Sequence, residues 1–262
     1  MERRRYALRL LYDGRCFRGF QRQPGLPSVQ ASLEEALHVA IGARPALQVA
    51  GRTDAGVSAL AQVVSFSARG ALDPAELRRR VNAALPEGLL CTGAARVSDS
   101  FHARASASGR RYVYLIGTPP PPEAAPWCWT LPDERAFPGL GPRPLDAAAM
   151  RAALAHAVGT HDFAGFARPG EQVGSVRTVT RADVVEADAG GLFALVLEGR
   201  GFLRAMVRNL AGTAAAAGFG LIPPERLGEL LLRPERYRGV RAPGWGLTLV
   251  SVSYPGDGPD WG

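Results

Sequence analysis

The strongest constraint on the fold is a glycine-bounded loop at residues 51–59 (GRTDAGVSA), which lies between two apolar runs at residues 46–50 and 61–66. Short apolar runs bounded by turn residues are typical of strands, so the sequence predicts a strand, a loop and a second strand. Gly51 and Gly56 allow backbone conformations and close approaches that other residues resist. A loop of this kind is suited to gripping a substrate.

The tip of this loop carries Asp54, with Arg52 two residues before it. If the chain enters the loop in an extended conformation, both side chains project from the same face. A neighbouring arginine keeps a carboxylate ionised, and an ionised aspartate can act as a nucleophile or a general base. The alternative interpretation is a turn in which Asp54 only bonds its own backbone.

The charge of the chain favours a nucleic-acid partner. Its 31 basic residues are all arginine, and they exceed the 24 acidic residues by seven charges. Arginine grips phosphate through a planar fork and stacks on bases. GC-rich codon usage also produces arginine in place of lysine, so the net charge is the better indicator. The sequence contains neither a P-loop nor a GxGxxG motif, which removes the usual signals for ATP or dinucleotide binding.

The positions of cysteine and histidine, and the distribution of apolar residues, further limit the class of protein. Cys16, Cys91 and Cys128 are far apart, and the four histidines are scattered, so we expect neither a disulfide framework nor a metal site. No apolar run approaches the roughly 18 residues that a membrane span needs. The first residues lack the apolar core of a signal peptide. The sequence therefore predicts a cytoplasmic protein.

The first part of the chain predicts alternating strands and helices. Residues 15–23 interleave arginine and glutamine with two phenylalanines, a composition that suits an RNA-facing loop or a solvated loop with two buried anchors. A tyrosine such as Tyr112, in a strand, is by itself more often a core residue than a catalytic one. The elements expected here are strands over 6–12, 89–97 and about 110–116, and helices over 28–42 and from Asp73 onward.

A proline-rich segment at residues 118–144 predicts irregular structure and a boundary. The expected domains are an N-terminal lobe over residues 1–117, this connecting segment, and a C-terminal lobe over residues 145–262. The elements expected after the boundary are helices over 145–158, from 201 and over 224–232, a hairpin of strands 178–185 and 192–197 with a turn at 188–191, and a strand over 247–254.

The helix that begins near residue 201 carries Arg208 at the edge of its apolar stripe. The stem of that side chain can lie on apolar surface while its head reaches a cleft. The alternative is that Arg208 serves only to cover apolar surface. From residues alone, the fold class is mixed α/β in two parts.

An ordered set of motifs spans nearly the whole chain: YDGxxFxGFQxQ, VQxxLExAL, GRTDAGV, FHARxSA, RRYxY, DFxxF, FLxxMVRN and GLxLVxVxYP. In this order the chain resembles the tRNA pseudouridine synthase A family. The resemblance implies an enzyme that isomerises uridine to pseudouridine at positions 38, 39 and 40 of the tRNA anticodon stem-loop, without a cofactor. It also implies a homodimer, and an α/β fold of two similar lobes whose antiparallel sheets join across a central cleft, with helices on the outer faces.

The resemblance also implies roles for individual residues. Asp54 would be the catalytic aspartate, Arg208 its ion-pair partner, and Tyr112 would lie against the target uracil. Arg52 would contact RNA and help to hold the flipped-out nucleotide, and Leu247 would form an apolar floor under the base.

Four more side chains are candidate substrate contacts: Phe20, Gln21, Arg104 and Arg110. The chain departs from the family at Ser58, where histidine is common, and at Phe20, where tryptophan is common.

The chemistry agrees with these roles. Pseudouridine formation breaks the C1′–N1 bond, rotates the uracil and rejoins it through C5, without net redox change or energy input. The reaction needs a carboxylate, an arginine to keep it ionised, walls for the loose base and exclusion of water. The base must also leave its stack, which costs a few kcal/mol. Whether the carboxylate attacks the sugar, attacks the base or removes a ribose proton stays open.

Two other functional classes fit parts of the sequence. A non-catalytic RNA-binding protein would explain the arginines and aromatics but leave the Asp54 loop without purpose. A hydrolase that uses Asp54 on a glycosidic bond would need a second carboxylate as general acid, and no motif offers one.

Overall fold

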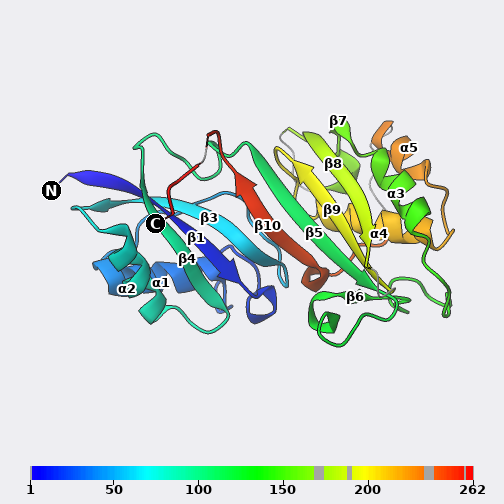
Figure 1. Cartoon of the computed structure of the whole chain (residues 1–262), viewed down its shortest axis with the longest axis horizontal. Coiled ribbons are helices and arrows are strands. Elements are labelled where there is room, and N and C mark those ends of the chain that lie inside the picture. The colour runs from blue at the N-terminus through cyan, green and yellow to red at the C-terminus, as the bar shows by residue number, and fades with distance from the viewer. Residues whose placement is uncertain (1, 168–173, 188–190, 233–238, 257, 262) are drawn as a thin grey trace. The chain divides into compact units, whose positions relative to one another are not determined.

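The computed structural model describes residues 2–167, 174–187, 191–232, 239–256 and 258–261 (Figure 1). The chain divides into two compact units, one of Met1–Arg110 with Leu249–Gly262 and one of Arg111–Thr248. The last strand therefore contributes to the first unit, because the chain returns there at its end. The division expected from the proline-rich segment, into residues 1–117, 118–144 and 145–262, stays a prediction.

The first unit is a sheet with two helices. Its strands follow the order β4-β1-β3-β10, with β2 beside β3, and β1 pairs antiparallel with both β3 and β4. Helices α1 and α2 contact one another, and α2 contacts β4. The elements are β1 (Arg3–Tyr12), α1 (Val29–Ile41), β2 (Gln48–Val49), β3 (Ser58–Arg69), α2 (Pro74–Ala84), β4 (Leu89–Val97) and β10 (Leu247–Ser253), the last belonging to this unit from Leu249 on.

Local sequence signals explain why these helices begin and end where they do. The Ser28 side chain accepts a hydrogen bond from the Ala31 backbone at the start of α1. Gly42 ends that helix in the left-handed region, with φ of 69°. The Asp73 carboxylate caps α2 in the same way as Ser28 caps α1. Capping of this kind satisfies backbone groups that a helix end leaves without partners, and both predicted helices are confirmed.

The second unit places strands in the order β5-β9-β8-β7, with the short β6 parallel to β5. The β8–β9 and β7–β8 pairs are antiparallel, which confirms the predicted hairpin, although residues 188–190 of its turn lie outside the described residues. In Figure 1, α4 lies behind β8 and β9. The elements are β5 (Gly109–Gly117), β6 (Trp129–Thr130), α3 (Ala147–Ala155), β7 (Gly159–Asp162), β8 (Val176–Glu186), β9 (Leu192–Gly199), α4 (Met206–Gly218) and α5 (Arg226–Leu232). The predicted α/β class, with mostly antiparallel strands, is confirmed.

Two helices of this unit are shorter than the sequence predicts. Helix α3 begins after Asp146, whose carboxylate caps it, and not at residue 145. Helix α4 begins at Met206, because Ala205 before it adopts a left-handed backbone with φ of 66°. Arg204 therefore precedes the helix and is not part of its first turn. The proline-rich segment is mostly irregular, as predicted, apart from β6 and one short 3-10 turn (Ala125–Trp127).

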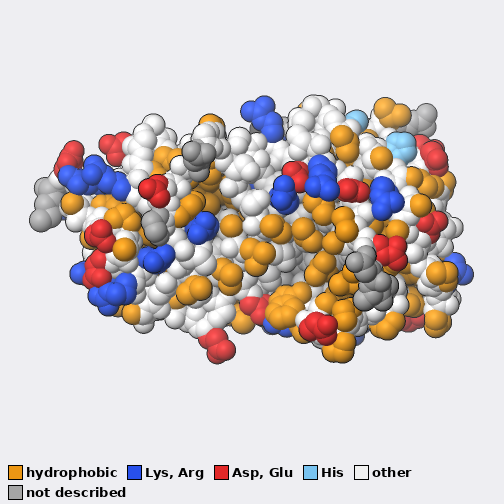
Figure 2. Space-filling model, in the orientation of Figure 1, with side chains coloured by type: hydrophobic (Ala, Val, Ile, Leu, Met, Phe, Trp, Pro, Cys, Tyr) orange, Lys and Arg blue, Asp and Glu red, His pale blue; other side chains and the backbone are white. Residues whose placement is uncertain are grey.

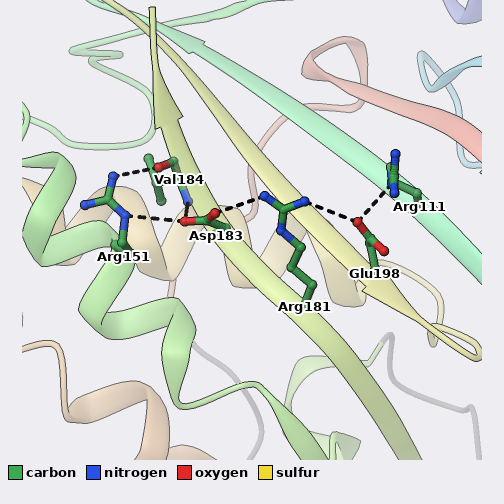
Figure 3. A network of polar contacts seen from close by, with 6 residues as sticks. All are labelled: Arg111, Arg151, Arg181, Asp183, Val184 and Glu198. Carbon is green, nitrogen blue, oxygen red and sulfur yellow. Dashed lines mark hydrogen bonds and ion pairs between the residues drawn. The ribbon is translucent and has the colours of Figure 1, made fainter.

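A chain of ion pairs ties three strands of the second unit to α3 (Figure 3). Arg111 contacts Glu198 at 2.9 Å, and Arg181 lies 3.6 Å from Glu198 and 3.1 Å from Asp183. Arg151 of α3 reaches Asp183 at 3.3 Å. The hydrogen bond from Arg181 is the main cause that holds the pKa of Asp183 below its ordinary value. Each partly exposed ion pair adds little to the stability of the fold. Together, these ion pairs mainly align the three strands with α3.

Candidate active site

The Asp54 loop connects β2 to β3 in the first unit, as the sequence predicts. The Val57 N–H donates to the Asp54 carbonyl at 3.2 Å, and Gly56 has φ of 80°, which a side chain would disfavour. Asp54 is half-buried and Arg52 is exposed. The loop is thus a tight turn that leaves the Asp54 side chain partly accessible, so a turn and a reactive carboxylate are compatible here.

The segment after β1 packs directly against this loop. A Cβ added at Gly19, which has φ of +100°, would lie 3.1 Å from the Thr53 carbonyl oxygen. A Cβ added at Gly14 would lie only 2.3 Å from the Val57 backbone. The Phe20 N–H donates to the Thr53 oxygen at 3.0 Å. The glycines of the YDGxxFxGF motif are therefore required by the close approach of two backbones.

Side chains of the same segment divide between core and solvent. Phe20 is only 2% exposed, and Phe17 is also buried, whereas Gln21 is exposed. This arrangement matches the interpretation of a solvated loop with two buried anchors. Phe20 supports the Asp54 loop through its backbone, and Gln21 is one of the exposed side chains of this segment.

The two arginines predicted as further substrate contacts differ in exposure. Arg104 is exposed, whereas Arg110 is 9% exposed. The Arg110 guanidinium donates to the Ala50 carbonyl at 2.7 Å and to the Arg104 carbonyl at 3.0 Å. Since Ala50 directly precedes the loop, these bonds brace the entry to it.

The second unit carries the other three predicted residues. Tyr112 in β5 is buried and packs edge-on against Phe202, with ring centroids 5.3 Å apart. Leu247 is buried at the start of β10, directly after the 3-10 turn Gly244–Gly246. Tyr114 packs so closely on Gly246 that a Cβ there would lie 2.6 Å from its ring.

Arg208 is half-buried in α4, beside the predicted apolar stripe, whose residues Leu203, Val207, Leu210 and Ala214 are all buried. Its Nε donates to the Ala242 carbonyl at 2.7 Å, and the Ala242 N–H donates to the Arg208 carbonyl at 3.2 Å. The bond from Nε thus anchors the guanidinium at a defined position.

Asn209, the residue after Arg208, also binds the segment that contains Ala242. The Asn209 amide donates to the Phe166 carbonyl at 2.6 Å and accepts from Arg241 at 3.2 Å. Asn209 is buried, and sequence analysis gave it no role. Segment 239–243 is consequently tied to α4 at two successive positions.

Two buried phenols are neutral at physiological pH. Burial raises the pKa of Tyr12 to about 12. Burial also raises the pKa of Tyr114 well above its ordinary value, and the positive charge of Arg208 opposes this rise. Both groups therefore keep their proton and act through hydrogen bonds, such as the one from the Tyr114 hydroxyl to the Pro243 carbonyl at 2.9 Å.

The predicted residues fall into two sets. Asp54, Arg52, Phe20, Gln21, Arg104 and Arg110 belong to the first unit, and Tyr112, Arg208 and Leu247 to the second. Among the described residues there is no group of three metal-ligating side chains, and none of the helices described is long and apolar enough to cross a membrane. On the face shown in Figure 2, arginine side chains lie among acidic and hydrophobic ones and do not gather in one patch.

Sequence comparisons agree with these motifs. The profile of a family described as tRNA pseudouridine synthase matches residues 153–255. The tRNA pseudouridine synthase A of Neisseria gonorrhoeae is 43% identical, covering 97% of this chain and 94% of the relative. Those of Frankia casuarinae and Thermus thermophilus are 43% and 41% identical, covering 97% and 96% of this chain and 90% and 97% of the relatives. The chain belongs to the tRNA pseudouridine synthase A family.

Proposed function

We propose that this protein is a tRNA pseudouridine synthase that isomerises uridine at positions 38, 39 and 40 of the anticodon stem-loop. The observation that carries the proposal is the GRTDAGV loop, with Asp54 partly accessible at its tip, in a chain that belongs to this family over 97% of its length. The substrate is tRNA, and the net charge of +7 suits a polyanionic partner.

The reaction balances without any co-substrate. The C1′–N1 bond of uridine breaks, the uracil turns, a C1′–C5 bond forms, and the proton on C5 is lost while N1 gains one. Product and substrate have the same atoms. The enzyme must supply a carboxylate, hold the detached base and exclude water.

In this proposal Asp54 is the catalytic carboxylate, and Arg208 keeps it ionised. The Arg208 Nε is committed to the Ala242 carbonyl, so its terminal nitrogens would be the donors toward a carboxylate. Tyr112, fixed by Phe202, and Leu247 would form the walls around the uracil.

We assign contacts to the rest of the RNA to those predicted side chains that are exposed. Arg52, Arg104 and Gln21 are exposed side chains that can reach RNA. Arg110 and Phe20 instead support the loop from within, as their buried side chains indicate. The working unit is a homodimer in the cytoplasm, an assignment that rests on the family.

The test compares Asp54→Asn with Asp99→Asn, an exposed aspartate 45 positions further along the chain, on tRNA transcripts. Pseudouridine is located by carbodiimide derivatisation and primer extension, and tRNA binding is measured separately. Asp54→Asn should abolish turnover and leave affinity within a few-fold, because removing one negative charge does not weaken phosphate contacts. Asp99→Asn should match the wild type.

Three outcomes contradict the proposal. Turnover of Asp54→Asn near that of the wild type would remove Asp54 from the mechanism. Release of free uracil would indicate the glycosidic hydrolase. Unaltered RNA after incubation with wild-type protein would indicate a binding protein without catalysis.

A further inference from the structure

A buried polar cluster beneath the Asp54 loop has no part in the roles described above. Tyr12 ends β1, Gln62 lies in the middle of β3, and Thr53 immediately precedes Asp54. Gln62 has no exposed surface, Tyr12 is 2% exposed, and Thr53 is also buried. Burying an amide and two hydroxyls costs free energy unless each is hydrogen-bonded, so their partners show what the cluster holds in place.

The Gln62 amide clamps the start of the loop. Its Nε2 donates to the Gly51 carbonyl at 2.6 Å, and its Oε1 accepts from the Gly51 N–H at 3.4 Å and from the Val63 N–H at 3.2 Å. A backbone carbonyl only accepts and a backbone N–H only donates, so these partners determine which end of the amide carries the NH₂ group. Both polar groups of the Gly51 backbone are thereby bound to β3.

The same amide orients the Tyr12 hydroxyl. Gln62 Nε2 donates to the Tyr12 oxygen at 3.2 Å, and the Tyr12 and Thr53 hydroxyl oxygens are 2.8 Å apart. The Tyr12 oxygen accepts from the amide, and either hydroxyl can be the donor in its hydrogen bond with Thr53. A continuous set of hydrogen bonds thus runs from β3 through Tyr12 to the residue that precedes Asp54.

We propose that Tyr12 and Gln62 are positioning residues for the Asp54 carboxylate, acting through Thr53 and Gly51. The proposal rests on the catalytic role proposed for Asp54. Both residues belong to strands that pair with each other, Tyr12 opposite Ala59. Loop residues that take part in chemistry require a rigid support, because small displacements of a reacting group reduce the rate strongly.

The chemistry of Tyr12 limits what it can do in this position. Burial raises the pKa of its phenol to about 12, so the group is protonated over the working range of an enzyme. It serves as a hydrogen-bonding group and not as a proton carrier. A variant without the hydroxyl should therefore lower the rate without changing the shape of its pH profile.

The chain offers a matched control for removal of this hydroxyl. Tyr6 lies in the same strand, is 0% exposed, and its hydroxyl also has two partners: it donates to the Gly70 carbonyl at 3.3 Å and accepts from the Leu72 N–H at 2.9 Å. Tyr12→Phe and Tyr6→Phe therefore remove the same group from similar surroundings. Of the two hydroxyls, that of Tyr12 is the one bonded to the Asp54 loop.

The experiment measures single-turnover pseudouridine formation, tRNA affinity and thermal melting for both variants. Tyr12→Phe should lower the rate by roughly 10-fold to 100-fold, the range expected when a reacting group is misplaced by a fraction of an ångström to 1 Å. Its tRNA affinity should be unchanged, and its melting temperature should fall about as much as that of Tyr6→Phe. The rate of Tyr6→Phe should remain that of the wild type.

A second pair of variants decides the question if Tyr12→Phe does not fold. Thr53→Val removes the hydroxyl that is hydrogen-bonded to Tyr12, and Thr53→Ser keeps a hydroxyl at this position. Slow turnover of Thr53→Val with recovery in Thr53→Ser supports the proposal.

Equal rates for Tyr12→Phe and Tyr6→Phe, or equal rates for the two Thr53 variants, overturn it. Wild-type protein that forms no pseudouridine would instead overturn the proposed function, so the two failures are distinguishable.

Discussion

Replacing Gly212 by alanine tests how the Arg208 guanidinium is held. Gly212 lies within α4, one turn after Arg208, where segment 239–243 crosses the helix. A Cβ built at this position would lie 1.9 Å from the Val240 carbonyl oxygen and 2.8 Å from its carbon. These are backbone atoms, so no side-chain rotation relieves the overlap.

The structure allows the size of the effect to be worked out. Alanine normally gains about 1 kcal/mol over glycine inside a helix. Overpacking costs roughly 1–3 kcal/mol, and the upper end applies here because backbone must move. The net loss is about 2 kcal/mol, which lowers the melting temperature of a chain of this size by about 4–8 °C.

The single-turnover rate of Gly212→Ala should also fall. To accept the Cβ, the crossing segment must retreat by roughly 1.5 Å, because the Val240 oxygen would otherwise lie 1.9 Å away and an ordinary contact begins near 3.4 Å. This movement would lengthen both hydrogen bonds between Arg208 and Ala242, which now measure 2.7 and 3.2 Å. A displacement of about 1 Å or more at the side chain proposed to pair with Asp54 should lower the rate by roughly 100-fold.

The assay pairs single-turnover rates with thermal melting, and Gly228→Ala in α5 is the control. A Cβ at Gly228 meets the ring of His156, at 2.9 Å from Nδ1, and a side chain can turn away where backbone cannot. Gly228→Ala should therefore leave the rate unchanged, and its melting temperature should not fall, because alanine favours the helix over glycine. A Gly212→Ala protein with the rate and melting temperature of the wild type would show that the crossing segment does not hold Arg208.

Three further predictions concern Arg208, the binding of tRNA and the oligomeric state. Arg208→Lys keeps the charge but loses the planar fork and the Nε donor to Ala242, so the single-turnover rate should fall by one to two decades, from a loss of roughly 1.5–3 kcal/mol. Its melting temperature should change little, since the lysine stem covers the same surface, and an unchanged rate would leave Arg208 a packing residue. Binding of tRNA should weaken steeply with salt, and light scattering should give about twice 27.8 kDa, whereas a fully active monomer would refute the dimer.

The sequence predicts helices and strands correctly where neighbouring residues in the chain determine them. Ser28 and Asp73 begin helices because a side chain caps the backbone a few residues on, and both caps are present in the structure. The start of α4 could not be predicted in this way. The apolar pattern continues back to Leu203, but the left-handed backbone of Ala205 interrupts the helix, and an alanine carries no sequence signal for that conformation.

In the candidate site, too, some features could be predicted from the sequence and others could not. The sequence by itself determined the family and the position of the Asp54 loop, because the motif residues and the flanking apolar runs are adjacent in the chain. Only the tertiary structure decided that Arg110 and Phe20 face inward and that Gln62 and Tyr12 support the loop. Gln62 and Tyr12 are 50 positions apart, and pairing of β1 with β3 brings them together. A buried polar side chain takes its role from its partners, and those partners are selected by the register of the sheet.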